Sequence, residues 1–150
     1  MKRLHVNLAV EDLETSITFY RTLFGAEPSV RKPDYAKWLL DDPRVNFSLS
    51  PRGQKTGIDH LGIQVDSTEE LGELAGRLKA AGQSVLEQPS ARCCYAKSDK
   101  VWVRDPQGVP WETFHTSEQL STFGEDRLSL PAEPPVKKAA CCDSTAMVGG

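Results

Sequence analysis

Residues 3–10 read RLHVNLAV, and residues 58–65 read IDHLGIQV. Both stretches are rich in aliphatic side chains that favour strands, and both have a histidine at the third position and a valine five residues later. An acidic residue follows each valine, Glu11 in the first stretch and Asp66 in the second. Because such internal similarity is typical of a repeated structural unit, the sequence predicts two copies of one motif.

A helix is expected after each of these two strands. In the first copy Asp12 can cap the helix and Gly25 can end it, while in the second Ser67 and Glu70 form a capping box and Gly82 is the terminator. Each helix has one apolar face at helical spacing, made of Leu13, Ile17, Tyr20 and Phe24 in the first copy and Leu71, Leu74, Leu78 and Ala81 in the second. Both helices are therefore expected to pack against a sheet.

Shorter strand-like runs follow each helix, and a turn at residues 42–43 or 105–108 joins the last two strands of each copy. The repeat unit is therefore βαβββ, and its two copies predict an α+β fold. When the turns are aligned, Glu112 of the second copy takes the position that Ser48 has in the first.

A chain of 150 residues is long enough for one domain with its own core. We expect this domain to span residues 1–118, with modules at about 1–52 and 57–118. The periodicity fades after it, so residues 119–150 are expected to be a largely disordered C-terminal extension.

The charge pattern and the cysteines narrow the class of protein. The formal net charge is -3, and no run of Lys or Arg could neutralise a series of phosphates, so nucleic acid is not expected as a partner. No apolar run is long enough to cross a membrane, and we expect a cytoplasmic protein. The four cysteines form two adjacent pairs, Cys93-Cys94 and Cys141-Cys142, and adjacent cysteines in a reducing compartment are better suited to act as free thiols than as disulfides.

Strand alternation indicates which side chains share a face. His5 and Asn7 lie on the face opposite the aliphatic positions of residues 3–10, and His60 lies on the matching face of the second copy. Glu112 falls on the corresponding face of the last strand. The sequence thus predicts that His5, His60 and Glu112 point into one polar cavity.

Two imidazoles and one carboxylate form the facial triad of non-haem iron(II) oxygenases, which leaves neighbouring positions of the metal open. Taken singly, each residue is more often an interior histidine or a surface acid, but their equivalent positions in the repeat favour a metal site. Ser48, a weak ligand, would keep the site open, and nickel, cobalt or zinc could replace iron. His115 has the opposite parity from Glu112, so we assign it no ligand role.

The chain resembles the vicinal-oxygen-chelate superfamily of glyoxalases, extradiol dioxygenases and bleomycin-resistance proteins over residues 1 to about 118. Within this span ARCCYA at residues 91–96, and VRDPQG at 103–108 followed by Trp111-Glu112, resemble one branch, the organoarsenical carbon-arsenic lyases and the related cadmium-induced proteins. The resemblance implies iron(II)- and dioxygen-dependent cleavage of trivalent organoarsenicals, such as methylarsonous acid or reduced aromatic arsenicals, to arsenite. It also suggests a homodimer, because such folds often pair.

The same resemblance implies roles for five residues. His5, His60 and Glu112 match the family's metal ligands and would form the catalytic centre, and Cys93 and Cys94 match its substrate-binding pair. Trivalent arsenic is thiophilic, and a monoorganic arsenous acid has two exchangeable hydroxyls that two thiolates can replace.

The segment Gln88–Lys100 carries proline and serines with little periodicity, so it is expected to be a mobile loop that bears the cysteine pair over the cavity. Its charges, Arg92, Lys97 and Lys100, could favour thiolates, but each is interpreted first as a solvated loop charge. The alternative for Cys93 and Cys94 is that they are two small buried hydrophobic residues.

Two other functions stay open at this point. The cavity and thiols could sequester cadmium or another soft metal without turnover, with Cys141 and Cys142 as an additional clamp. The chain could also be another enzyme of the superfamily, although a glyoxalase normally needs a fourth ligand where Ser48 stands, and a catechol dioxygenase leaves the cysteine pair unexplained.

Overall fold

The computed structural model describes residues 1–52 and 55–124. The elements follow the order β1-α1-β2-β3-β4 and then β5-α2-β6-β7-β8, which confirms the predicted βαβββ repeat. In the first module they are β1 Arg3–Ala9, α1 Leu13–Phe24, β2 Val30–Lys32, β3 Tyr35–Asp41 and β4 Arg44–Ser50. In the second they are β5 Gly57–Gln64, α2 Thr68–Ala80, β6 Leu86–Cys93, β7 Ala96–Arg104 and β8 Pro110–Gln119. Most of the predicted extension, with Cys141 and Cys142, lies outside the described residues.

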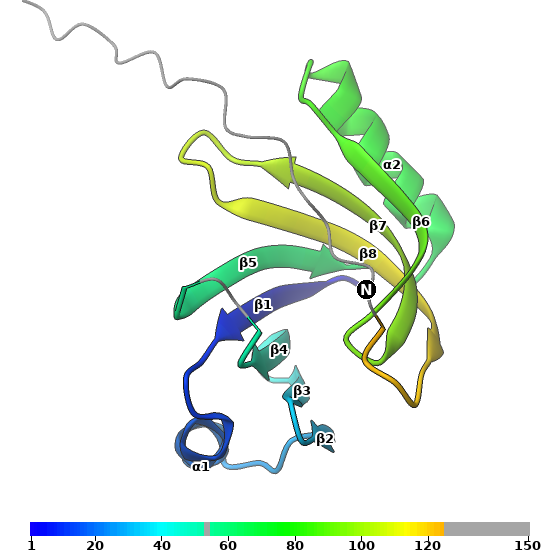
Figure 1. Ribbon diagram of the computed structural model, residues 1–150. Coiled ribbons are helices and arrows are strands. Elements are labelled where there is room, and N and C mark those ends of the chain that lie inside the picture. The colour runs from blue at the N-terminus through cyan, green and yellow to red at the C-terminus, as the bar shows by residue number, and fades with distance from the viewer. Residues whose placement is uncertain (53–54, 125–150) are drawn as a thin grey trace, which may run out of the picture.

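The strands of the described chain form one curled eight-stranded sheet in the order β2-β3-β4-β1-β5-β8-β7-β6 (Figure 1). The two modules meet at its centre, where β1 and β5 pair antiparallel, while β1–β4 and β5–β8 are parallel pairs. The helices pack on the outer side of the curl, α1 against β3 and β4 and α2 against β7 and β8. This arrangement is the predicted α+β vicinal-oxygen-chelate fold, with the inner face of the sheet left for a site.

The helix ends follow the predicted capping residues. Asp12 accepts a hydrogen bond from the Thr15 amide at 2.6 Å, and Gly25 ends α1 with a left-handed φ of 62°. Ser67 accepts from the Glu70 amide at 3.3 Å, but the Glu70 carboxylate accepts from the amide of Asp66 rather than of Ser67. Only half of the predicted capping box is therefore formed. In the described part of the chain, no helix is both long and apolar enough to cross a membrane.

Each helix buries its apolar face in a core cluster of its own module. Leu13 and Ile17 of α1 pack with the buried side chains of β3 and β4, which include Trp38, Phe47 and Leu49. The second cluster is smaller and consists of Val65, Leu71, Ala75 and Val101. Each large side chain buried in this way contributes about 1.5–3 kcal/mol, so packing against the sheet holds both helices in place.

The aliphatic face predicted for β1 is only partly buried. Val6, Leu8 and Val10 pack against the core cluster under α1, whereas Leu4 lies outside that cluster and stays 48% exposed. The opposite face carries His5, Asn7 and Ala9, all buried because the sheet curls over them.

The segment Gln88–Lys100 is a β-hairpin, so the prediction of a loop is wrong. Strands β6 and β7 pair through Arg92 with Lys97 and Cys93 with Ala96, and Cys94 and Tyr95 form the two-residue turn. Both turn residues have left-handed φ angles, 54° and 60°. A two-residue hairpin needs this backbone shape to match the strand twist, and it usually takes Asn or Gly there. Because Cys and Tyr stand in these positions, composition did not reveal the turn.

Candidate active site

The sheet register places the three predicted metal ligands next to one another. Between β1 and β5, His5 lies opposite Gly62 and Asn7 lies opposite His60. Between β5 and β8, Gly62 lies opposite Glu112. His5, Gly62 and Glu112 therefore occupy one row across three strands, with His60 in the next row.

Gly62 allows the two strands around it to approach closely. A Cβ atom at this position would lie 2.0 Å from the backbone oxygen of Glu112, a distance that no side chain tolerates. In the first module the equivalent pair is Asn7 and Ser48, which lie opposite each other in β1 and β4. Ser48 thus occupies the position that Glu112 has in the second module, and its hydroxyl donates to Asn7 Oδ1 at 2.7 Å.

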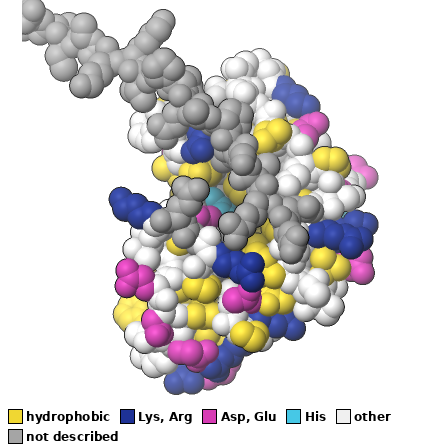
Figure 2. All heavy atoms as spheres, viewed as in Figure 1, with side chains coloured by type: hydrophobic (Ala, Val, Ile, Leu, Met, Phe, Trp, Pro, Cys, Tyr) yellow, Lys and Arg dark blue, Asp and Glu magenta, His cyan; other side chains and the backbone are white. Residues whose placement is uncertain are grey.

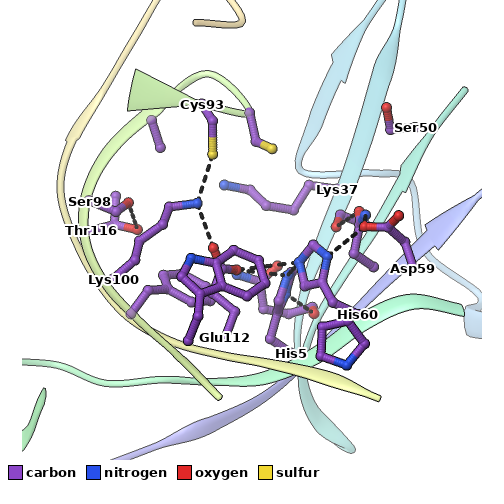
Figure 3. A pocket seen from close by; sticks show the side chains of 18 of the residues that line it. His5, Lys37, Ser50, Asp59, His60, Cys93, Ser98, Lys100, Glu112 and Thr116 are labelled. Carbon is purple, nitrogen blue, oxygen red and sulfur yellow. Dashed lines mark hydrogen bonds and ion pairs between the residues drawn. The ribbon is translucent and has the colours of Figure 1, made fainter. Parts of the chain in front are cut away.

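The side chains of the three residues converge on a common point (Figure 3). His5 Nε2 and His60 Nε2 are 3.1 Å apart, and Glu112 Oε2 lies 3.6 Å from the former and 3.4 Å from the latter. His5 and Glu112 are only 5% and 3% exposed. The group has the residue types, the spacing and the burial that a metal ion requires, because its ligand atoms all lie within 4.8 Å of one another.

The outer ring nitrogens show that these residues fit a cation. His5 Nδ1 lies 3.0 Å from the backbone oxygen of Asn46, and His60 Nδ1 lies 2.7 Å from Asp59 Oδ2. A carbonyl and a carboxylate accept hydrogen bonds, so both Nδ1 atoms carry a hydrogen, and each imidazole in its neutral form offers the Nε2 lone pair to an ion. In that form two lone pairs and the Glu112 carboxylate face one another. These three groups can bind a divalent metal ion, and the hydrogen bonds at Nδ1 hold both histidine rings in the orientation that this requires.

The charges of His60 and Glu112 shift each other's pKa, and both charges also act on the pKa of His5. Burial lowers the pKa of His5 to about 4, even though Glu112 opposes this effect. Burial also lowers the pKa of His60, but hydrogen bonds with Asp59 and Glu112 outweigh it and raise that pKa to about 9. The pKa of Glu112 is held well below its usual value, since Lys100 and His60 overcome the effect of burial. Without a metal, a proton on His60 balances this carboxylate.

Lys100 connects His5, His60 and Glu112 with the cysteine pair. The sequence did not predict that one side chain contacts both Glu112 and Cys93. Its Nζ lies 2.5 Å from Glu112 Oε1 and 2.7 Å from Cys93 Sγ, and the residue is only 7% exposed. The interpretation of Lys100 as a solvated loop charge is wrong, because it belongs to β7 and faces inward with Ser98 and Trp102. The alternation of residues 98–102 was the signal that could have found it.

Cys93 ends β6 and Cys94 begins the turn, and both are free thiols that line the inner cavity. A hydrogen bond from Cys94 and the Lys100 charge outweigh burial and lower the pKa of Cys93 to about 6. The same hydrogen bond and burial raise the pKa of Cys94 well above its usual value. Near pH 7 the pair therefore holds one thiolate and one thiol.

The tip of the hairpin is attached to the first module. Tyr95 Oη donates to Asp34 Oδ1 at 2.5 Å, and Asp34 also forms an ion pair with Arg52. The Arg52 guanidinium stacks on the Phe123 ring at 3.9 Å, and that ring lies 5.5 Å from the Tyr95 ring. These contacts fix the cysteine turn over the inner face of the sheet.

His5, His60 and Glu112, called the metal group below, share one cavity of about 610 Å³ with the cysteine pair. Figure 2 shows a histidine side chain within this hollow of the molecular surface. Polar side chains of the first module, including Asn7, Lys37 and Ser48, form one wall, and Trp102 and Phe114 belong to the other. His115 does not line the cavity, as its parity predicted.

Comparison with known proteins identifies a family and several relatives that this chain resembles. Residues 2–113 match the Glyoxalase/Bleomycin resistance protein/Dioxygenase superfamily. A trivalent organoarsenical cleaving enzyme from Bacillus sp. is 46% identical over 153 residues, which cover 97% of this chain and 93% of the relative. The cadmium-induced protein CadI of Mycobacterium tuberculosis is 36% identical over 150 residues, covering 99% and 98% of the two chains.

Solved structures share the architecture at lower identity. An extradiol ring-cleaving dioxygenase from B. fuscum superimposes with a TM-score of 0.60 at 20% identity, over 79% of this chain and 33% of that protein. At this identity the likeness shows the fold alone.

Proposed function

Because this chain belongs to the glyoxalase/bleomycin resistance protein/dioxygenase superfamily, we propose that it cleaves the carbon-arsenic bond of trivalent organoarsenicals and releases arsenite. In this proposal Fe(II) is held by His5, His60 and Glu112, dioxygen is the cosubstrate, and Cys93 and Cys94 bind the arsenical. The observation that carries it is that a three-ligand group and a vicinal thiol pair share one cavity. The organoarsenical-cleaving relatives support the choice of substrate.

Iron(II) would supply the redox chemistry with dioxygen that no side chain can provide. His5, His60 and Glu112 would hold the ion, and a set of three protein ligands would leave it able to bind small molecules as well. Ser48 does not compete for such a position, because its hydroxyl is engaged with Asn7. Nickel, cobalt or zinc would fit the same donors, and zinc, which has no redox chemistry, would not support turnover.

The cysteine pair would capture the substrate by exchange. The Cys93 thiolate attacks arsenic and one hydroxide leaves, taking the Cys94 proton to form water. Cys94 then displaces the second hydroxide, which takes a proton from solvent. Two arsenic–sulfur bonds replace two arsenic–oxygen bonds, and the organic group stays on arsenic.

Lys100 would place the captured arsenic relative to the metal group. Its ammonium contacts Cys93 and Glu112 at once, so the sulfur that binds arsenic lies one side chain away from a metal ligand. The hairpin contacts of Tyr95 with Asp34 hold the sulfurs on this side of the cavity. With arsenic on these sulfurs, the chain would hold the carbon-arsenic bond on the side of the cavity where His5, His60 and Glu112 would bind the metal.

The test is turnover by protein purified without oxygen and loaded with Fe(II). Addition of methylarsonous acid or phenylarsonous acid should cause oxygen uptake and release of arsenite, and both should stop in zinc-loaded protein. Cys93→Ser should weaken capture with iron still bound, whereas His60→Ala should lose iron and activity. If the iron-loaded protein binds the arsenical through its cysteines but consumes no oxygen and releases no arsenite, sequestration replaces cleavage as its function.

A further inference from the structure

A second lysine points into the cavity from the opposite wall. Lys37 lies in β3 and is only 8% exposed, although its side chain carries a charge. The register places Lys37 beside Ser48, Ser48 beside Asn7, and Asn7 beside His60, so the four form a polar row across the inner face. Figure 3 shows the Lys37 side chain extending into the space that Cys93 and Lys100 also face.

Among the cations of the cavity in the described residues, Lys37 differs from Lys100, Arg52 and Arg104 in having neither a counter-ion nor a hydrogen-bond acceptor for its side chain. Lys100 contacts Glu112 and Cys93, Arg52 forms an ion pair with Asp34, and Arg104 donates to the Gly108 carbonyl. Within residues 1–52 and 55–124, no hydrogen bond or ion pair joins the Lys37 ammonium to another group. An ammonium group that faces a cavity without a protein acceptor can bind an anionic group of a ligand by a charge-assisted hydrogen bond.

Capture of arsenic leaves Lys37 facing no negative charge from the cysteine pair. Before capture the pair holds its one negative charge on Cys93, and that sulfur contacts Lys100 rather than Lys37. Both sulfurs are neutral once they are bonded to arsenic, so a charge that compensates Lys37 has to come from the organic group on arsenic.

The size of the cavity allows such a group. A volume of about 610 Å³ is typical of sites for drug-sized ligands and far exceeds the needs of a methyl substituent. Trp102 and Phe114 provide an apolar wall for an aromatic ring, and Lys37 lies on the polar wall across from them.

We propose that Lys37 recognises a carboxylate on the organic substituent, so that the site prefers trivalent arylarsenicals that carry an acidic group over neutral ones. This inference rests on the proposed capture of arsenic by Cys93 and Cys94. It makes Lys37 a specificity-determining residue.

The test compares phenylarsonous acid with its 3-carboxy and 4-carboxy derivatives by titration calorimetry on the metal-free protein. At least one carboxylated compound should bind about tenfold more tightly than the parent, as expected for a charge-assisted hydrogen bond in a buried site. Lys37→Met and Lys37→Gln should remove this advantage and change the affinity for phenylarsonous acid by less than about threefold, while Lys37→Arg should keep most of the advantage.

Lys97→Met is the matched control. Lys97 lies in the β6–β7 hairpin near the cysteine pair, but it does not line the cavity. It should leave both affinities unchanged. If neither carboxylated compound gains over the parent, or if the Lys37 variants weaken all three compounds equally, the proposal is overturned. If Cys93→Ser leaves binding of phenylarsonous acid intact, the capture mechanism itself fails, which is a separate result.

Discussion

Lys100 Nζ lies 2.5 Å from Glu112 Oε1, and both side chains are almost completely buried. Lys100 also contacts Cys93, so its ammonium group links the cysteine turn with Glu112. Burial alone would lower the pKa of Lys100, but the charges of Glu112 and Cys93 raise it instead. Lys100 therefore stays charged. Its replacement should change both the stability of the protein and the pKa of Cys93, each in a direction that follows from the loss of this charge.

Lys100→Met should destabilise the metal-free protein by up to about 3–5 kcal/mol, because it removes one of the two cations, Lys100 and His60, that face the buried Glu112 carboxylate. A metal at the site supplies a positive charge in its place, so the loss should be smaller in zinc-loaded protein. Urea unfolding of both forms measures the two differences. An equal loss with and without zinc would show that the lysine acts through packing and not through charge.

The reactivity of Cys93 should follow its lowered pKa. The thiolate is the nucleophile, so the rate of alkylation by iodoacetamide should rise as the pH passes about 6 and then level off. A thiol in water would continue to gain reactivity up to about pH 8.5. In Lys100→Met, which removes the ammonium that contacts the Cys93 sulfur, the midpoint should move upward. Peptide-resolved mass spectrometry of the metal-free protein gives the rate for this cysteine alone.

Metal binding should release protons below pH 9. His60 has a pKa of about 9 in the metal-free protein, so at lower pH the ion must displace its proton. The affinity for zinc should then rise by about tenfold for each pH unit between 6 and 8, since the competing proton becomes scarcer. Calorimetry in buffers with different ionisation enthalpies counts the released protons. An affinity that does not change over this range would mean that His60 is neutral before the metal arrives.

Alternation and repetition in the sequence were enough to predict that His5, His60 and Glu112 come together in one cavity. His5 and His60 have equivalent places in the repeat, and strand parity sets the face of Glu112, so their positions follow from the backbone pattern. Strand alternation is a local pattern, and the equivalence of the two modules follows from the repeat. Neither depends on the conformation of the loops.

The contacts around the ligands could not be predicted in the same way. Lys100 was missed because the turn at Cys94 and Tyr95 lacks the residues that mark a hairpin, so the strand that carries it was interpreted as a loop. The link from Tyr95 to Asp34 joins residues 61 positions apart in different modules. Such a contact depends on how the sheet curls, which no local pattern in the sequence encodes.

Gly62→Ala should damage the site without touching any ligand side chain. A Cβ atom there would lie 2.0 Å from the Glu112 backbone oxygen, so β5 and β8 must move apart and separate the histidines from the carboxylate. Overpacking of this kind costs about 1–3 kcal/mol, and the affinity for zinc should fall more than about tenfold.

Gly76→Ala in α2 provides the matched control, because a Cβ atom at Gly76 meets nothing within 4 Å. This change should raise the stability by about 0.5–1 kcal/mol, since alanine is the better helix former, and should leave zinc affinity unchanged. Thermal unfolding and zinc titration of both variants separate the two effects. If Gly62→Ala binds zinc as tightly as the parent protein, the metal site does not depend on the close pairing of β5 and β8, and the register argument for the centre is wrong.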